Sequence, residues 1–270
     1  FLLRISQEKK LEDIEYEVRL LEKLKNENFP AAYPFKDKLR NYIQRTRHGI
    51  AIVYEFIDGA EPAVNAGTTG EIAHAVARLN SLPGWQDFRR DNPISFSFCC
   101  SLISRFSSAK NQFPEVFRYF EEETHFLKEP MKVALPEGLI HGDVFTDNTL
   151  FRGNKLVAII DWEEACTDRL LVDAGMTING FCFIKNRLDE ALFQVFLRAY
   201  NRSRTLSKEE KALLPHYIEL GAHAMLSWHL SYLLEDKEER KYKRMLELKD
   251  RVITLRKSRA KIEQLTQKTF

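Results

Sequence analysis

Three oxygen-bearing side chains lie close together in one segment of the chain, residues 140–165. Asp143 and Asn148 are five residues apart, and Asp161 follows at the end of an apolar run. Phosphoryl transfer needs a carboxylate that orients and deprotonates a hydroxyl, and further oxygen ligands that hold magnesium against the phosphates. Carboxylate and amide oxygens suit Mg²⁺, a hard ion that keeps several waters and is shared with substrate phosphates. The segment therefore has the residue types that phosphoryl transfer to a hydroxyl requires.

A β-hairpin is predicted between these residues. Leu150–Phe151 and Leu156–Ile160 are short apolar runs, and the Gly153-Asn154 pair between them tolerates positive φ. Folding this hairpin brings Asp161 back beside the loop that carries Asp143 and Asn148. The alternative is that residues 141–143 form a simple turn and that Asp161 only ends a strand. The hairpin and Asn148 together favour the chemical interpretation.

The pattern HGDxxxxN followed by IIDWE resembles the aminoglycoside phosphotransferase and choline kinase superfamily, which shares the protein-kinase fold. The resemblance implies an α+β fold of two lobes, with a truncated N-terminal lobe and a mostly helical C-terminal lobe that carries the catalytic hairpin. It also implies ATP and Mg²⁺ as cofactors, Asp143 as the catalytic base, and Asn148 and Asp161 as metal ligands. His141 is then expected to brace the loop from beneath.

A cation and an acid are expected to pair in the N-terminal part. Phe1–Ile5 reads as an apolar strand that carries Arg4, and Leu11–Asn26 has the apolar spacing of a helix that carries Glu17. In kinases a cation on such a strand pairs with a Glu on the helix and contacts the α and β phosphates. The usual cation is Lys, and Arg at this position resembles choline kinases. The alternative is that both residues are ordinary surface charges.

The run Ile50–Gly59 is predicted to be a buried strand that enters a linker. By resemblance it is the hinge between the lobes, and the carbonyl of Glu55 and the amide of Ile57 would contact adenine. We expect residues 1–57 to be the remnant of the N-terminal lobe and residues 58–270 to form the C-terminal lobe. Because no glycine-rich phosphate loop is present, we expect the chain to be a fragment that lacks the first hairpin of the N-terminal lobe.

The rest of the chain is predicted to be mainly helical. Apolar spacing indicates helices over Ile72–Leu82, Phe113–Leu127, Leu188–Tyr200 and Leu213–Leu234. The alternating charges of Lys237–Lys268 indicate a solvated helix. Four aromatic residues on the predicted helices are expected to lie in the core: Phe193, Phe196, Tyr217 and Trp228.

Composition excludes several other classes of protein. The 270 residues are 44% apolar, and the 41 basic and 39 acidic residues are well mixed, which argues against a nucleic-acid-binding surface. No segment is long and apolar enough to cross a membrane, and no signal peptide is visible. The cysteines lack metal or disulfide spacing, so we expect buried thiols in a cytoplasmic enzyme; they are Cys99, Cys100, Cys166 and Cys182. Nothing in the sequence indicates the oligomeric state.

Three segments suggest which molecule accepts the phosphoryl group. They resemble type II homoserine kinases and comprise residues 78–93, 168–183 and 214–235. The implied reaction transfers the γ-phosphoryl group of ATP to the hydroxyl of L-homoserine, in threonine biosynthesis. An amino acid needs a cation for its carboxylate and an acid or carbonyl for its ammonium. Candidate substrate contacts are Glu163, Asn179 and Arg187, whereas Asp173 is expected to orient the helix that follows it.

Two alternatives remain open. The first is a kinase of the same superfamily that acts on choline, a sugar or an aminoglycoside, since Phe181 stands where homoserine kinases have Trp and Asn80 where they have His. The second is a pseudokinase that binds nucleotide without turnover, which Arg4 in place of Lys would favour. The intact Asp143, Asn148 and Asp161 argue against the second.

Overall fold

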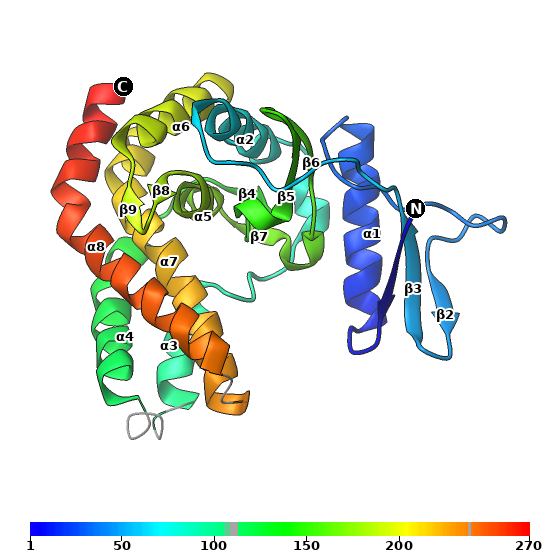
Figure 1. Cartoon of the computed structure of the whole chain (residues 1–270), viewed down its shortest axis with the longest axis horizontal. Coiled ribbons are helices and arrows are strands. Elements are labelled where there is room, and N and C mark those ends of the chain that lie inside the picture. Colours follow the sequence, from blue (N-terminus) through cyan, green and yellow to red (C-terminus); the bar gives the residue numbers. More distant parts are fainter. Residues whose placement is uncertain (106, 108–112, 237–238) are drawn as a thin grey trace.

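The computed structural model describes residues 1–105, 107, 113–236 and 239–270. A small lobe of three strands and one helix stands beside a larger, mostly helical lobe (Figure 1). One segment after β3 runs from the small lobe to the large one, and the boundary expected after Ile57 lies in it. Among the described residues, none of the helices combines the length and the apolar character that a bilayer crossing requires.

The small lobe is an antiparallel sheet covered on one side by a helix. Its strands are β1 (Leu2–Ser6), β2 (Gln44–Thr46) and β3 (Gly49–Tyr54), in the order β1-β3-β2. Helix α1 (Leu11–Asn26) begins and ends as its apolar spacing predicts, and its buried face includes Ile14 and Leu21. Glu17 lies on that same buried face, so α1 presents a carboxylate toward β1 and Arg4.

The predicted hairpin is present in the large lobe. It consists of β5 (Thr149–Arg152) and β6 (Lys155–Ile159), paired antiparallel, with Gly153 at a positive φ of 63° in the turn. A second pair, β4 (Glu137–Ile140) and β7 (Cys166–Arg169), lies next to it in the chain. Strand β4 leads directly into the loop that carries Asp143, and β6 leads to Asp161, so both ends meet at the same place.

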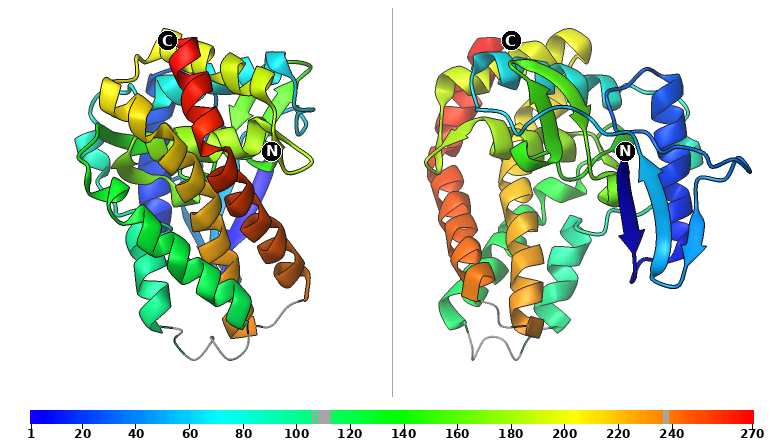
Figure 2. Two further views of the ribbon diagram at one scale, coloured as in Figure 1. Left: turned by 90° about the vertical axis from the view of Figure 1, so that its left-hand side faces the viewer. Right: turned by 45° about the vertical axis from the view of Figure 1, so that its right-hand side comes forward.

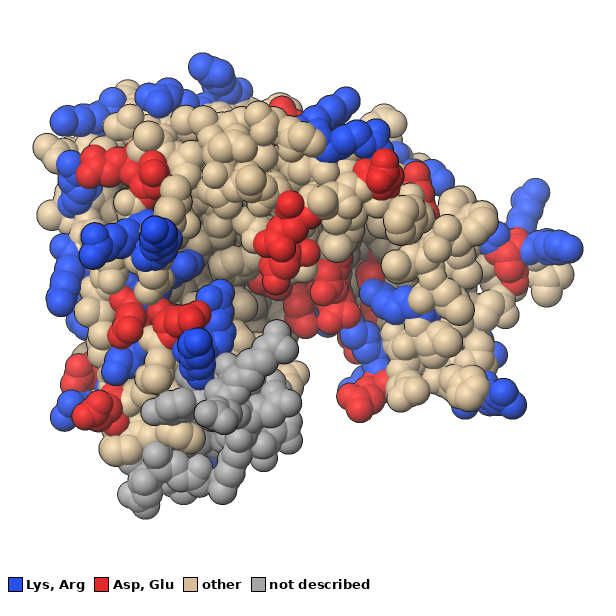
Figure 3. All heavy atoms as spheres, in the orientation of Figure 1, with Lys and Arg blue, Asp and Glu red and all other residues tan. Residues whose placement is uncertain are grey.

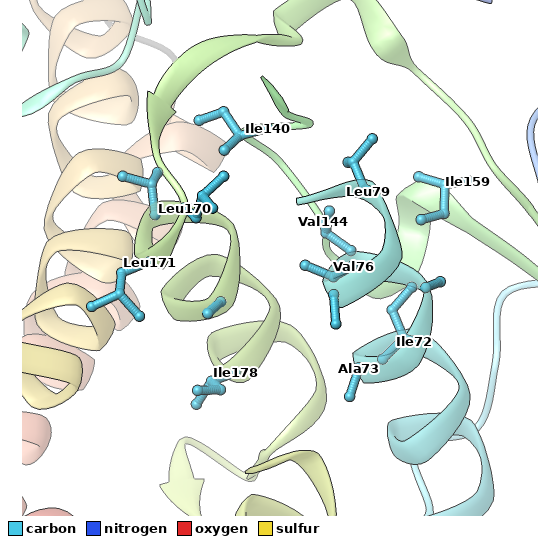
Figure 4. Close-up of a cluster of buried hydrophobic side chains, with 14 of the residues drawn as sticks. Ile72, Ala73, Val76, Leu79, Ile140, Val144, Ile159, Leu170, Leu171 and Ile178 are labelled. Atoms are coloured by element: carbon cyan, nitrogen blue, oxygen red, sulfur yellow. The ribbon is translucent and has the colours of Figure 1, made fainter. Parts of the chain in front are cut away.

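The remaining elements form the helical body. The helices are α2 (Ala66–Leu79), α3 (Phe96–Arg105), α4 (Pro114–Leu127), α5 (Leu171–Phe181), α6 (Glu190–Ser203), α7 (Lys208–Asp236) and α8 (Glu239–Thr269), with a small hairpin of β8 (Phe183–Ile184) and β9 (Arg187–Leu188) after α5. Apolar side chains from α2, α5 and the two strand pairs form one buried cluster, which includes Val76, Ile140, Ile159 and Ile178 (Figure 4). The cluster includes Val144, so it packs against the loop of residues 141–148, which we name the catalytic loop after the role expected of Asp143.

Helix α5 packs very closely against α7 through a glycine. A Cβ atom added at Gly175 would lie 2.2 Å from the carbonyl oxygen of Tyr217, so any larger residue would push the two helices apart. Since α5 also carries Asp173, this close approach helps to fix the position of a side chain that contacts the catalytic loop.

The sequence expectations need correction in several places. Helix α2 starts six residues before Ile72, because Asn65 and Thr68 form a capping box that begins the helix at Ala66. Helix α3 was not anticipated. The carboxy-terminal helix α8 is not solvated all round, because it lies along α7 and buries an apolar stripe that includes Met245, Leu248, Val252, Leu255 and Ile262 (Figure 2). Cys100 is exposed, whereas the other three thiols are buried and all four are free.

Candidate active site

Two cavities meet beside Asp161. The first has a volume of about 470 Å³ and lies between the small lobe and the β5–β6 hairpin. The second, of about 260 Å³, is lined by the catalytic loop and α7. Asp161 and Glu163 line both cavities, so a molecule in one would touch a molecule in the other at these two side chains. Acidic side chains gather in the hollow between the lobes (Figure 3).

The loop before Asp143 is held by a buried carboxylate. Asp173 accepts hydrogen bonds from the backbone amides of His141 (2.9 Å) and Gly142 (2.8 Å), and from the side-chain amide of Asn80 (3.1 Å). Gly142 has a φ of 84°, which a glycine adopts without strain and which turns the chain sharply before Asp143. Asp173 therefore orients the preceding loop, and not the following helix as the sequence suggested.

His141 supports the same loop, as expected. It is fully buried, its Nε2 lies 2.9 Å from the carbonyl of Ile160, and its Nδ1 accepts from the amide of Asp143 at 3.3 Å. Burial lowers the pKa of His141 to about 4, partly opposed by the bond to Ile160. A neutral ring with its proton on Nε2 satisfies both contacts, so His141 ties the loop to the end of β6 without taking part in proton transfer.

Asp143 and Asn148 are held against each other. The Asn148 amide donates to the Asp143 carboxylate (2.8 Å) and to its backbone carbonyl (2.9 Å). The second carboxylate oxygen of Asp143, Oδ1, is buried and has no hydrogen-bond partner among the described residues. Burial, followed by repulsion from Asp147, raises the pKa of Asp143 to about 7, although the bond from Asn148 acts in the opposite direction. A group of this pKa can accept a proton near neutral pH.

Asp161 has an uncommon backbone conformation. Its φ of 62° and ψ of 61° lie in the left-handed region, which costs a residue other than glycine roughly 1–2 kcal/mol. The turn directs the chain from β6 into the short helix Trp162–Glu164, with Trp162 buried against the ring of His141. Burial raises the pKa of Asp161 to about 6, and the neighbouring Glu163 adds to this effect.

The donor set beside Asp161 fits a hard divalent ion. Within the described residues, no three His, Cys, Asp or Glu side chains lie close enough to form a metal cage made of protein ligands alone. Asn148 uses its amide nitrogen on Asp143, which leaves its oxygen free, and Asp161 faces the same cavity. One amide oxygen and one carboxylate, completed by phosphates and water, match the coordination habit of Mg²⁺.

Arg4 and Glu17 form the pair that the sequence suggested. The Arg4 guanidinium lies 2.5 Å from the Glu17 carboxylate, and Tyr54 donates its hydroxyl to the same carboxylate at 3.1 Å. The guanidinium also lies over the Tyr54 ring, 5.1 Å from its centre. Both residues line the larger cavity, so α1 holds a positive charge at the wall of that cavity.

The connection between the lobes contributes to the same cavity. Glu55 and Ile57 line it, and the amide of Glu55 donates to the carbonyl of Tyr33. Neither the carbonyl of Glu55 nor the amide of Ile57 forms a hydrogen bond within the described part of the chain. Both groups can therefore bond to a ligand. Apolar residues on either side, Leu2, Leu21, Leu150 and Ile160, form walls suited to a flat aromatic base.

Comparison with known proteins identifies the family. The family model described as "Phosphotransferase enzyme family", APH, matches residues 1–211. The chain belongs to this family. The chain is 28% identical over 207 residues to a homoserine kinase of Bradyrhizobium diazoefficiens, and 29% identical over 209 residues to one of Rhodopseudomonas palustris BisA53. These matches cover 75% and 76% of this chain but 63% and 64% of the two relatives.

Solved structures show that the chain has the fold of this family. It superposes on an aminoglycoside phosphotransferase from Alicyclobacillus acidocaldarius with a TM-score of 0.71, at 14% identity, over 98% of this chain and 86% of the other. The amicoumacin kinase hAmiN, in a complex with AMP-PNP, Ca²⁺ and Ami, gives a TM-score of 0.70 at 12% identity, over 93% and 80%. A choline/ethanolamine kinase family protein from Mesorhizobium loti gives 0.68 at 15%, over 98% and 85%.

The three candidate substrate contacts lie in different parts of the large lobe. Glu163 lines both cavities and forms an ion pair with Lys9. Asn179 does not reach either cavity, because its buried side chain donates to the carbonyls of Gly175 and Ile218 between α5 and α7. Arg187 lies in the exposed part of the β8–β9 hairpin and lines neither cavity. Of the three, only Glu163 lines the cavities and therefore remains a candidate substrate contact.

Sequence reasoning missed four residues near the site. Lys9 reaches Glu163 from the loop before α1, and its charge lowers the pKa of Asp161. Asp147 and Glu164 line the smaller cavity, and the acidic run after Asp161 was a signal for Glu164. Trp228, expected in the core with Phe193, Phe196 and Tyr217, instead lines the smaller cavity, whereas the other three are buried. Its position on α7 can be recognised only when the tertiary packing is known.

Proposed function

We propose that this phosphotransferase transfers the γ-phosphoryl group of ATP to the hydroxyl group of a small molecule. The observation that carries the proposal is the meeting of Asp143, Asn148 and Asp161 in one cavity that adjoins a second, largely apolar cavity. The first cavity has the groups for proton acceptance and metal binding, and the second suits a nucleotide. Few other reactions need this combination.

Each residue of the site then has a defined role. Glu55 and Ile57 bond to adenine through their backbones, and Arg4, held by Glu17, contacts the α and β phosphates. Mg²⁺, held by Asn148 and Asp161, would neutralise phosphate charge. Asp143 accepts the proton of the acceptor hydroxyl while the oxygen bonds to the γ-phosphorus and the bond from phosphorus to the leaving β-phosphate oxygen of ADP breaks.

We propose L-homoserine as the acceptor, which would place the enzyme in threonine biosynthesis. The support is the similarity to proteins named homoserine kinase, at 28% and 29% identity. In the smaller cavity, Glu163 or Glu164 would bind the ammonium group, and Asp143 would reach the hydroxyl. Because the reaction uses ATP and all four thiols are free, we expect the enzyme to act in the cytoplasm.

A second acceptor class is favoured by the charge of the smaller cavity. Five of its lining residues are acidic, namely Asp143, Asp147, Asp161, Glu163 and Glu164, and no Lys, Arg or His among the described residues lines it. A carboxylate-bearing acceptor would have to approach these acids, whereas an amino alcohol such as choline would be attracted by them. The half-buried Trp228 offers an aromatic face to such a cation.

A panel of acceptors distinguishes these candidates. The full-length protein is incubated with [γ-³²P]ATP, MgCl₂ and L-homoserine, choline, a hexose or an aminoglycoside, and the transferred label is measured. Labelling of L-homoserine at the highest kcat/KM supports the homoserine assignment. Preferential labelling of choline supports the amino-alcohol class instead. Absence of magnesium-dependent transfer to every acceptor, together with retained nucleotide binding, would indicate a pseudokinase.

The role of Asp143 is tested by Asp143→Asn in the full-length protein. We expect kcat to fall by at least about 10³-fold while the affinity for ATP changes little, because the amide keeps the shape of the side chain but cannot accept the proton. Asp58→Asn, which removes an exposed carboxylate that pairs with Arg152 and lines neither cavity, is the matched control and should retain normal kcat. Unchanged turnover in Asp143→Asn would refute the assignment of the base.

A further inference from the structure

A third cavity lies outside the candidate active site. It has a volume of about 350 Å³ and is formed by the segment before α3, the end of β7 and the facing sides of α5 and α7. It shares no lining residue with the two cavities that meet at Asp161. Its size is near the lower end of the range typical of small-molecule sites, roughly 300–1,000 Å³. The acceptor and the nucleotide therefore leave this cavity unused.

Two polar groups in its wall have no partner. Tyr217 is only 1% exposed, and its hydroxyl forms no hydrogen bond with any described residue. The Arg169 Nε is buried and also unpaired, and its guanidinium forms no ion pair within the described part of the chain. A buried donor without an acceptor costs roughly 1–3 kcal/mol, so two of them lining one cavity call for an explanation.

One of the two acids that line this cavity, Asp168, already accepts hydrogen bonds from other groups. Asp168 accepts from the side-chain amide of Asn92 at 2.8 Å and from the backbone amide of Arg169 at 2.7 Å. Burial raises the pKa of Tyr217, and the nearby charge of Arg169 only partly opposes this effect, so the phenol keeps its proton and remains a donor. Asp91 also lines the cavity, yet neither the Arg169 Nε nor the Tyr217 hydroxyl forms a hydrogen bond with it or with any other described residue.

The remaining wall has an apolar part and a polar part. Phe96, at the start of α3, and Leu220, on α7, belong to the apolar part with Met131 and Val172. The polar part consists of Asp91, Asn92, Ser95, Ser97, Thr167 and Asp168. A ligand with an acceptor at one end and a hydrocarbon part at the other would match the two unpaired donors and the apolar part. A guanidinium with a hydroxyl beside it binds carboxylates through short, charge-assisted hydrogen bonds.

We propose that this cavity binds a small organic carboxylate with an apolar tail, whose carboxylate accepts hydrogen bonds from Arg169 and Tyr217. The tail lies against Phe96, Met131 and Leu220. Binding gives both unpaired donors a hydrogen-bond acceptor. The resulting gain in free energy does not depend on which molecule accepts the phosphoryl group. Arg169 ends β7 and lies opposite Glu137, at the end of β4 away from the loop that carries Asp143.

The test uses 4-methylpentanoate, L-leucine and 4-methylpentan-1-ol as probes, measured by isothermal titration calorimetry on the full-length protein. The two carboxylates share the tail but differ in the ammonium group, and the alcohol lacks the carboxylate. We expect at least one carboxylate to bind with a Kd below about 1 mM, and the alcohol to bind at least about tenfold more weakly. Comparing the Kd of L-leucine with that of 4-methylpentanoate shows whether the cavity tolerates an α-amino group.

Three variants make the result specific. Arg169→Gln and Tyr217→Phe should each weaken carboxylate binding by about tenfold or more, whereas Arg89→Gln, which removes a neighbouring arginine that does not line this cavity, should bind normally. Tyr217→Phe should have a melting temperature at least as high as that of the parent, because the deleted hydroxyl has no partner in the unliganded protein. Such a melting temperature would show that weaker binding by Tyr217→Phe is not caused by a folding defect.

The proposal fails if neither carboxylate binds the parent protein at concentrations up to about 20 mM. It also fails if the alcohol binds as tightly as the carboxylates, or if Arg169→Gln and Tyr217→Phe bind as tightly as the parent. Binding is measured again in Asp143→Asn, where it should be unchanged. The outcome for this cavity is therefore independent of whether the proposed kinase activity is correct.

Discussion

At the scale of single residues, the site is an accumulation of acids that repel one another. Asp143, Asp161 and Glu164 all have a raised pKa, in each case because burial disfavours the charged form and acidic neighbours add to it. A carboxylate with a raised pKa binds a proton or a cation more readily than an ordinary one. Holding these acids close together lowers the stability of the folded protein. The fold can hold them because different segments position the individual side chains.

This cost gives a prediction for Asp143→Asn. The folded pKa of about 7 is above the ordinary value of 3.8, so between these two values the folded state binds more protons than the unfolded state. Asp143 therefore lowers stability progressively as the pH rises from about 4 to 7. The amide cannot ionise, so Asp143→Asn should be more stable than the parent by about 1–3 kcal/mol at pH 8, after allowance for partial exposure, and by much less at pH 5.

Urea denaturation of both proteins at the two pH values, in buffer with EDTA, measures the difference. Asp58→Asn, at an exposed position, should give no comparable gain. A variant that is equally or less stable than the parent at pH 8 would show that the surroundings of Asp143 do not disfavour its charge.

At the scale of elements, the catalytic loop takes its shape from α5. The buried Asp173 accepts from two successive loop amides, so the loop conformation depends on a helix that begins about thirty residues later in the chain. The apolar spacing of α5 predicts burial but gives no sign of this contact. Local patterns therefore predicted the hairpin and α1, whose signals are complete within a few residues, and failed for Asp173 and Asn179, whose partners lie far along the sequence.

Asp173→Ala should disturb this loop. It leaves the amides of His141 and Gly142 without an acceptor, so we expect a loss of about 2–4 kcal/mol in stability and a fall in kcat of about 10–100-fold, with the KM for ATP little changed. Asp189→Ala is a matched control, because Asp189 also accepts from two backbone amides, at the start of α6. It should cost about 1 kcal/mol and leave kcat unaltered. Equal kcat values for both variants would contradict the positioning role.

The last helix shows why a charge pattern can mislead. The alternating charges of α8 suggested solvent on all sides, yet a stripe at helical spacing packs against α7. Leu255→Ala should lower the free energy of unfolding by about 2–5 kcal/mol, since Leu255 is fully buried. Lys257→Ala, at an exposed position two residues further on, should change it by less than about 0.5 kcal/mol. Similar small effects of both substitutions in urea denaturation would contradict the packing of α8 on α7.

At the scale of the whole molecule, the larger cavity is built from both lobes. Arg4, Glu17 and Tyr54 come from the small lobe, whereas Leu150 and Ile160 come from the hairpin of the large lobe. A family resemblance based on a few residues predicted this arrangement, because the fold and its catalytic motif occur together. It could not predict which side chains complete the smaller cavity, since Trp228 and Met225 are brought there by the course of α7.

A nucleotide that contacts both lobes should stabilise the whole chain. At an ADP concentration of 100 times Kd, in the presence of Mg²⁺, we expect a gain of about 2.7 kcal/mol over the nucleotide-free protein. Glu17→Ala should weaken ADP binding by about tenfold, because Arg4 loses the carboxylate that holds it at the cavity wall. Thermal denaturation at fixed ADP concentrations measures both effects. A melting temperature that does not depend on ADP in the parent protein would rule out nucleotide binding in this cavity.

The shared border of the two site cavities has a consequence for inhibitor design. A bisubstrate compound, in which an adenosine moiety is tethered to an acceptor mimic, would have to pass its spacer between Asp161 and Glu163. A polyphosphate spacer without a metal ion would meet two negative charges there. A tether that carries an amine or guanidine would instead be attracted at its midpoint, and it would compete with Lys9 for Glu163.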